Sequence, residues 1–182
     1  MTDTDPFSLL GLPRTFDLDA EALQRAYLTQ AARLHPDLSG LPQDESEAKS
    51  AQLNEARTEL LNPERRADRL LTLLGGPCKE ADKALPTGFL MEIMETREAV
   101  EEALASKDPS QRTHWQHWAA EQRTRYIDLV RGQFAALASL TQPSERSTHL
   151  KAIRQTLNAW RYIERLIEQL DPAYNPAKAD FR

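Results

Sequence analysis

Proline and glycine residues divide this chain of 182 residues into segments whose apolar side chains recur every three or four positions. That period is typical of amphipathic helices, and no window shows the alternating β-branched residues of a strand. Hydrophobic residues make up 40% of the chain, which is enough to bury a core in one domain or in two small ones. The pattern therefore predicts an all-α protein.

A helical hairpin is predicted near the amino terminus. The apolar face of its first helix consists of Leu23, Tyr27, Ala31 and Leu34, and its solvent face of Glu21, Gln24, Arg25 and Arg33. Asp17 or Asp19 can cap the start of this helix. Pro36 has no backbone N–H and disfavours helical geometry at His35, so the helix should end at about Leu34.

A polar loop and a second helix are expected after the tripeptide His35-Pro36-Asp37. The loop covers residues 38–45, whose Gly, Pro and acidic residues suit an exposed turn. The second helix is expected from about Ser46, with Leu53, Ala56 and Leu60 packing back on the first. A further short helix, Pro63–Leu74, should end at Gly75-Gly76-Pro77, which offers a C-cap glycine and a helix breaker.

Three long periodic segments follow, roughly Thr87–Ser106, Pro109–Leu140 and Ser144–Leu170, with Asp108 and Ser144 as expected caps. Because the connections are short, neighbouring helices should be antiparallel and form a three-helix bundle. The expected core residues of the middle helix are Trp115, Trp118, Tyr126, Leu129, Phe134 and Leu137. Those of the last helix are Leu150, Ile153, Leu157, Trp160, Ile163, Ile167 and Leu170. The predicted organisation is 1–76, a linker 77–86, the bundle 87–171 and a frayed or extended tail 172–182.

The first helix of this bundle has two apolar sides. Phe89, Ile93, Val100 and Leu104 share one face, and Met91, Met94, Glu95, Glu98 and Glu102 share the opposite face. Only one of these faces can point into a three-helix core, so the other should present two methionines beside Leu90 and a row of carboxylates. Tyr162 lies opposite the core stripe of the last helix and adds to this surface. Exposed methionines bordered by charge are typical of a protein interface. The alternative is that Met91 and Met94 pack against the amino-terminal module while the glutamates are solvated.

Composition and charge exclude several functions. A net charge of -5 argues against nucleic-acid binding, and Cys78 is the only cysteine, so neither an internal disulfide nor a cysteine-rich zinc site is expected. The acidic, polar start of the chain fits neither a secretory signal nor a transit peptide, and no apolar run approaches membrane-spanning length. A soluble cytoplasmic protein is expected, or a mitochondrial matrix protein if a presequence has been removed.

An enzymatic centre is not predicted. His114 and His117 lie three residues apart on a helix, but no third ligand is near in sequence, so they are interpreted as surface residues and no metal or cofactor is expected. His35 with Asp37 lacks a nucleophile in an identifiable context.

His35-Pro36-Asp37 between two helices resembles the J-domain, which stimulates ATP hydrolysis by DnaK-type chaperones, and residues 5–12 are similar to its short first helix. Nearly the whole chain, from Phe7 to about Leu170, resembles the HscB/Jac family of J-domain co-chaperones of iron-sulfur cluster biogenesis. Residues 61–71 are similar to that family's segment leaving the J-domain, and Phe89-Leu90-Met91-Glu92 with Arg97-Glu98 to its client-binding helix.

This resemblance implies an adaptor without a catalytic site of its own. Its J-domain would bind an HscA or DnaK-type ATPase through His35, Pro36, Asp37, Arg25 and Arg33. Its bundle would bind the scaffold protein IscU, and the positions matching the family's scaffold contacts are Leu90, Met91, Met94, Glu95, Glu98, Glu102 and Tyr162. No nucleic acid or membrane partner is expected. The alternatives are a helical adaptor that contacts no chaperone and a general J-protein with a different client.

Overall fold

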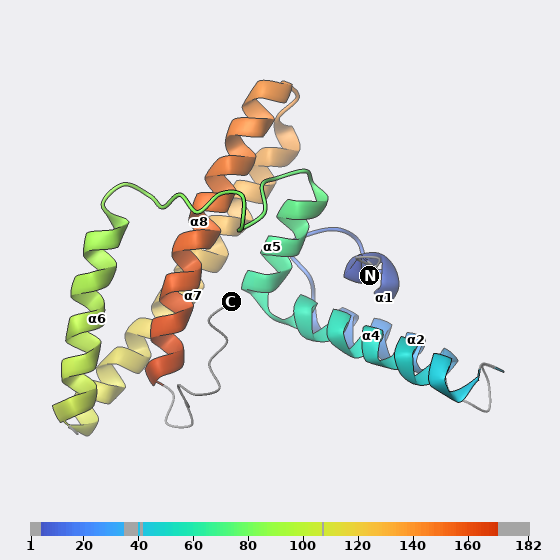
Figure 1. The fold of residues 1–182 in the computed structure, drawn as a ribbon, viewed down its shortest axis with the longest axis horizontal. Helices are drawn as coiled ribbons and strands as arrows, with labels where there is room; N and C mark the ends of the chain where they lie inside the picture. Colours follow the sequence, from blue (N-terminus) through green and yellow to red (C-terminus); the bar gives the residue numbers. More distant parts are fainter. Residues whose placement is uncertain (1–4, 35–39, 41, 107, 171–182) are drawn as a thin grey trace. The chain divides into compact units, whose positions relative to one another are not determined.

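The computed structural model describes residues 5–34, 40, 42–106 and 108–170, and the regular structure within these ranges is entirely α-helical. The all-α prediction is confirmed. The chain divides after Gly76 into two compact units, Met1–Gly76 and Pro77–Arg182. Figure 1 shows the helices of both units coloured along the sequence.

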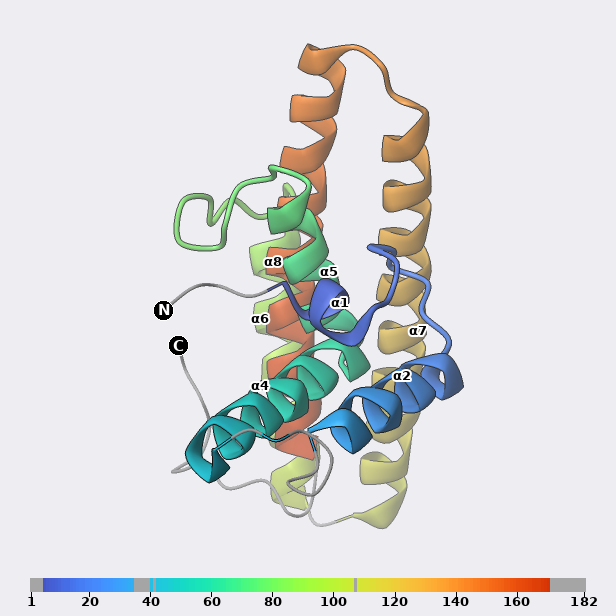
Figure 2. The same ribbon diagram turned by 90° about the vertical axis from the view of Figure 1, so that its right-hand side faces the viewer.

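The first unit is built on a helical hairpin. The helices α2 (Ala20–Arg33) and α4 (Gln43–Leu61) pack side by side, as Figure 2 shows, while α1 (Pro6–Leu10) contacts both and α5 (Pro63–Leu73) packs on α4. The buried apolar side chains of the unit are Phe7, Leu10, Phe16, Leu23, Leu53, Ala56, Leu60, Ala67, Leu70 and Leu71. The predicted packing positions on α4 are therefore confirmed.

The ends of the hairpin helices agree only partly with the sequence analysis. Asp19 caps α2 by accepting hydrogen bonds from the backbone N–H groups of Glu21 and Ala22, and Leu34 is the C-cap residue, as expected. The expected start of the second helix at Ser46 is wrong, because α4 already begins at Gln43. Asp44 and Glu45 lie in its first turn, where carboxylates interact favourably with the helix dipole. The predicted tripeptide His35-Pro36-Asp37 lies outside the described residues.

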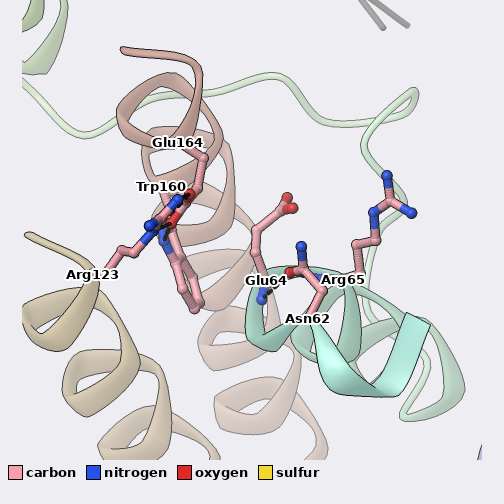
Figure 3. Close-up of polar contacts among 6 residues, drawn as sticks. All are labelled: Asn62, Glu64, Arg65, Arg123, Trp160 and Glu164. Atoms are coloured by element: carbon pink, nitrogen blue, oxygen red, sulfur yellow. Dashed lines mark hydrogen bonds and ion pairs between the residues drawn. The ribbon is translucent and has the colours of Figure 1, made fainter. Parts of the chain in front are cut away.

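The helix α5 begins and ends at defined capping motifs. The Asn62 side chain accepts hydrogen bonds from the N–H groups of Glu64 and Arg65 at 2.9 and 3.1 Å, which Figure 3 shows. At the other end, the Gly75 N–H donates to the Thr72 carbonyl and the Gly76 N–H to the Leu71 carbonyl, a Schellman motif in which Gly75 has φ +82°. This backbone geometry favours glycine at position 75, because most other residues would be strained there.

The second unit contains three helices in mutual contact, α6 (Phe89–Ser106), α7 (Pro109–Ser139) and α8 (Pro143–Leu170). Asp108 caps α7 as expected, accepting a hydrogen bond from the Ser110 N–H at 2.8 Å. The prediction that Ser144 caps α8 is wrong, because Ser144 lies inside the first turn of a helix that begins at Pro143. The three-helix arrangement itself is confirmed.

The core of the second unit centres on α8. All seven apolar residues that the sequence places on its inner stripe are buried, and the Trp160 ring stacks on Tyr126 with centroids 5.9 Å apart. The prediction for α7 holds only in part. Tyr126 and Leu137 are buried, whereas Trp115, Trp118 and Phe134 are only half-buried. Leu129 is 46% exposed, and its neighbour Val130 is fully buried instead. The indole N–H of Trp160 donates to Glu164 at 3.0 Å, and Glu164 also pairs with Arg123 at 2.8 Å (Figure 3).

The segment expected to be a linker, 77–86, is part of the second unit. The amide nitrogen of Asn158 on α8 donates hydrogen bonds of 3.0 Å to the carbonyl oxygens of Asp82 and Ala84. Gly88 then takes φ +82° immediately before α6, so this helix begins two residues later than expected. The predicted tail, 172–182, lies outside the described residues.

Candidate functional site

The helix α6 buries one face and exposes the other. Phe89, Ile93 and Val100 are 8%, 6% and 0% exposed, which confirms their predicted place in the bundle. Leu104 was expected on the same face but is only half-buried, and Ala103 is buried instead. At the carboxyl end of α6, the buried position is therefore taken by the smaller Ala103 rather than by Leu104.

The outer face of α6 is apolar at its amino-terminal end. Leu90, Met91 and Met94 are 54%, 72% and 57% exposed, so the bundle does not bury them. Exposing large apolar side chains in water is unfavourable by roughly 25 cal/mol per Å2. Methionine is also flexible and polarisable, which suits contact with a partner of variable shape. Their exposure is the feature of this helix that folding of the bundle does not explain.

Tyr162 extends this apolar surface from α6 to α8. Its side chain is 40% exposed, and its ring meets the buried Phe89 ring edge to face, with centroids 6.1 Å apart and an interplanar angle of 67°. That geometry is favourable for two aromatic rings. We define the α6–α8 patch as Leu90, Met91, Met94 and Tyr162.

Acidic side chains continue the outer face of α6 beyond the patch. Glu95, Glu98 and Glu102 are all exposed, as expected. The arginine within this stretch, Arg97, donates a hydrogen bond of 2.7 Å to Glu101, which raises the pKa of Arg97 and offsets its positive charge. An adaptable apolar centre with an acidic border is the composition of a reversible protein interface.

The arginines predicted to bind a chaperone lie on the exposed side of α2. Arg25 is 66% exposed and forms ion pairs with Glu21 at 3.3 Å and with Asp19 at 3.6 Å. Arg33 is exposed in the last turn of the helix. The other predicted chaperone-binding residues, His35, Pro36 and Asp37, lie outside the described residues.

Polar contacts across the hairpin change the expected role of Gln24. The sequence analysis assigned Gln24 to the solvent face, but its side-chain oxygen accepts a hydrogen bond of 2.9 Å from Arg57 Nε on α4. The Arg57 guanidinium also lies over the Tyr27 ring, 5.1 Å from its centroid, and the Tyr27 hydroxyl donates to Asn54 at 2.7 Å. These contacts hold α2 against α4, and helical periodicity alone carries no signal for them.

Two features of the hairpin escaped the sequence analysis. Leu28 on α2 is 55% exposed although it sits in an amphipathic helix, and the Ser46 hydroxyl donates a hydrogen bond of 2.7 Å to the Leu34 carbonyl. The sequence signal for Leu28 is its position on the polar face of α2, out of register with Leu23 and Tyr27. For Ser46, in contrast, nothing in the sequence indicates which carbonyl oxygen its hydroxyl would contact.

The other candidates of the sequence analysis that the structure describes, His114, His117 and Cys78, are exposed. Within the described ranges, no group of three or more His, Cys, Asp and Glu side chains is placed to hold a metal ion. His117 Nδ1 lies 3.3 Å from Glu121 on the exposed side of α7, and Cys78 is exposed. None of the helices in the part of the chain that the structure describes is both long and apolar enough to span a bilayer.

Comparisons with known families agree with both units. Residues 5–68 match the DnaJ domain family, and residues 85–171 match the family described as the HscB C-terminal oligomerisation domain. A co-chaperone protein HscB homolog of Bordetella petrii is 34% identical, and the match covers 95% of this chain and 98% of the relative. A homolog of the same name in Paraburkholderia phymatum is 32% identical, with 90% of each chain covered.

Solved structures of similar fold carry the same name. The human co-chaperone protein HscB is similar with a TM-score of 0.72 and 25% identity, over 93% of this chain and 82% of that one. The chaperone HscB from Vibrio cholerae gives a TM-score of 0.71 and 26% identity, over 92% and 95%. A J-domain in such a protein implies an Hsp70-type chaperone as partner. The chain belongs to the HscB family of J-domain co-chaperones.

Proposed function

We propose that this protein stimulates the ATPase of a DnaK- or HscA-type chaperone and delivers an IscU-type scaffold protein to it, in support of iron-sulfur cluster assembly in the cytoplasm. The observation that carries this proposal is the exposed α6–α8 patch, because the bundle has no use for these side chains in its own core. Family membership supports both halves of the proposal.

The scaffold would bind on the second unit. Leu90, Met91, Met94 and Tyr162 would supply the apolar contact, and Glu95, Glu98 and Glu102 would face basic groups of the scaffold. Centrally placed apolar side chains contribute most of the free energy of binding, whereas charges at the border mainly increase the association rate.

The chaperone would bind on the first unit. His35, Pro36 and Asp37 would bind polar and arginine groups of the ATPase, and Arg25 and Arg33 would contact the chaperone from α2. The protein itself would have no catalytic site. It would accelerate hydrolysis by binding more tightly to the chaperone conformation that is poised to hydrolyse ATP, which shifts the population toward that conformation.

Two variants test the two halves separately. Replacing Leu90, Met91 and Tyr162 together with alanine should weaken binding of purified IscU by roughly 30-fold or more, which corresponds to at least 2 kcal/mol from buried anchor residues. Calorimetry would measure this affinity, and circular dichroism would check that helix content and melting are retained. Loss of the fold together with binding would instead make these residues structural.

The second variant, His35→Gln, should abolish stimulation of steady-state ATP turnover by the purified chaperone while IscU binding stays at the wild-type level. Wild-type protein that leaves ATP turnover unchanged would refute the chaperone half of the proposal. Failure to bind IscU, with stimulation intact, would favour a general J-protein with a different client.

A further inference from the structure

A cleft lies between α6 and α7 in the second unit, on the side of α6 that faces away from Tyr162. Its volume is about 260 Å3, and five large apolar side chains line it: Phe89 and Ile93 from α6, Trp118 and Leu129 from α7, and Ile163 from α8. We call this the α6–α7 cleft. Small-molecule sites are usually larger, about 300 to 1,000 Å3. The cleft therefore suits a single large side chain better than a separate ligand.

Leu129 at this cleft is not explained by the packing of the bundle. Among the described residues of the second unit, it is the only exposed large apolar side chain outside the α6–α8 patch. It follows Trp118 by eleven residues, close to three helical turns, so both lie along the same side of α7. A single exposed leucine is common on protein surfaces, but this one borders a recess with apolar walls.

A buried hydroxyl at the cleft also lacks a partner. Tyr126 is 9% exposed and lines the cleft, and its hydroxyl forms no hydrogen bond within the part of the chain that the structure describes. Burial raises the pKa of Tyr126, the charge of Arg125 lowers it and the charge of Glu92 raises it. Both charged residues line the cleft, so the hydroxyl lies near its charged edge. Buried polar groups are normally hydrogen-bonded, so this hydroxyl suits a polar group that an occupant brings.

Opposite charges border the cleft. Glu92 on α6 and Arg125 on α7 are both exposed, and neither forms an ion pair among the residues that the structure describes. An apolar recess with a polar border is the arrangement that receives an anchor side chain at a protein interface. Because the border carries both signs of charge, it suits a protein surface of mixed charge better than a strongly charged ligand.

The cleft is continuous with the α6–α8 patch through Phe89. The Phe89 ring contacts Tyr162 of the patch and also lines the cleft. The patch and its three border glutamates comprise seven residues. A stable interface uses about 20 to 30 residues on each side. A scaffold protein that binds the patch therefore needs further contacts, and the α7 side of α6 offers the remaining exposed apolar side chain of this unit.

We propose that an IscU-type scaffold protein contacts α6 on both sides, and that it inserts one large apolar side chain into the α6–α7 cleft, against Leu129 and Trp118, while it covers the α6–α8 patch. This inference rests on the proposed function, because it names a second contact of the same partner. A polar group next to the inserted side chain would form a hydrogen bond with the Tyr126 hydroxyl. Arg125 and Glu92 would face scaffold groups of opposite charge.

Replacing Leu129 with glutamine tests the cleft without changing the patch. Glutamine keeps a high helix propensity and a similar length, so the fold should be retained. Calorimetry with the whole chain and purified IscU should show a dissociation constant raised about tenfold or more, because most of the apolar contact of Leu129 is lost. Leu61→Gln is the matched control, since Leu61 is an exposed leucine of the first unit, and it should change the dissociation constant by less than about twofold.

Filling the cleft separates a binding role from loose packing. Thr96 lines the cleft, and its hydroxyl donates a hydrogen bond of 2.8 Å to the Glu92 carbonyl of its own helix. Thr96→Phe should place a ring in the cleft, which should keep or raise the melting temperature and weaken IscU binding by about tenfold or more. Thr124→Phe is the control, because Thr124 donates in the same way to the Ala120 carbonyl but is exposed outside the cleft. It should leave IscU binding within about twofold of wild type.

Wild-type affinity of Leu129→Gln for IscU would overturn this inference and leave the proposed function intact. A stable Thr96→Phe variant that binds IscU normally would do the same, because the cleft would then be only a gap in the packing. Circular dichroism would check the helix content of both variants, and if Thr96→Phe unfolds, Leu129→Gln decides alone. Wild-type protein that does not bind IscU at all would overturn the scaffold half of the proposed function, and this inference with it.

Discussion

The Ser46 hydroxyl donates a hydrogen bond of 2.7 Å to the carbonyl oxygen of Leu34. Leu34 is the C-cap residue of α2, and Ser46, which is 5% exposed, lies near the start of α4. The last carbonyl groups of a helix have no partner within the helix, so this contact satisfies one of them. It joins the two ends of the segment that contains the proposed chaperone-binding tripeptide.

Replacing Ser46 with alanine should lower the free energy of unfolding by about 1 to 3 kcal/mol, because a partly buried carbonyl loses its donor. Urea titration followed by circular dichroism would measure the change. Thr58→Ala is the matched control, since the Thr58 hydroxyl also donates to a helix carbonyl but on an exposed face, and it should change stability by less than about 0.5 kcal/mol. Equal effects of the two variants would mean that the Ser46 contact contributes nothing specific.

The two faces of α6 should respond differently to the same truncation. Ile93→Ala should destabilise the protein by about 2 to 5 kcal/mol, because Ile93 is 6% exposed and its loss leaves a cavity. Met91→Ala, only two residues away, should change stability by less than about 0.5 kcal/mol, since Met91 is 72% exposed. Chemical denaturation would compare the two variants. A similar loss for Met91→Ala would show that the outer face supports the fold.

The amino-terminal cap should make the first unit sensitive to acid. Partial burial alone would raise the pKa of Asp5, but hydrogen bonds from Ser8, Arg14 and the Phe7 N–H outweigh it and hold the pKa below its ordinary value of 3.8. A lowered pKa in the folded state means that the carboxylate stabilises the fold fully above pH 3.8. This contribution is lost as the pH falls through the folded-state pKa.

Asp5→Ala should therefore cost about 0.5 to 2 kcal/mol at neutral pH. The difference in free energy of unfolding between wild type and Asp5→Ala should narrow once the pH falls below 3.8. Thermal unfolding across acidic pH would measure this difference. Glu55→Ala, which removes an exposed carboxylate from α4, serves as the control. A constant gap between wild type and Asp5→Ala over the whole pH range would contradict the assignment to ionised Asp5.

Glu164 should matter more to the bundle than its exposed neighbour Glu168. Replacing Glu164 with alanine removes the acceptor of the buried Trp160 indole N–H and the partner of Arg123. Leaving a buried donor unsatisfied costs about 1 to 3 kcal/mol, whereas Glu168→Ala should cost less than about 0.5 kcal/mol. Unfolding monitored by tryptophan fluorescence would measure both. If the losses are equal, the Trp160 contact has no special role.

The sequence could predict the two faces of α6 because both depend on local helix geometry alone. A helix turns by a fixed angle per residue, so the separation of Ile93 from Met91 follows from their numbers once the helix is assigned. The same reasoning failed on α7, where the buried stripe includes Ala119 and Val130. The larger Leu129 is exposed beside Val130, so residue size was a misleading guide to the side of α7 that packs on its neighbours.

The sequence analysis could not predict individual side-chain hydrogen bonds between helices. The bond from Ser46 to Leu34 and the bond from Arg57 to Gln24 each join residues on different helices, and no local pattern marks either pair. The start of α4 was placed three residues late because the acidic run at 44 and 45 resembles a loop, although acidic residues also favour a helix amino terminus.

The edge-to-face contact between Phe89 and Tyr162 connects a partly exposed ring on the surface of the second unit with a buried ring in its core. A partner protein that binds on Tyr162 would contact a ring that packs against the buried Phe89 ring. Its arrival should restrain the opening turns of α6, so backbone amides there would exchange with deuterium more slowly in the complex. Conversely, a substitution that loosens the packing around Phe89 should weaken the binding of a partner at Tyr162.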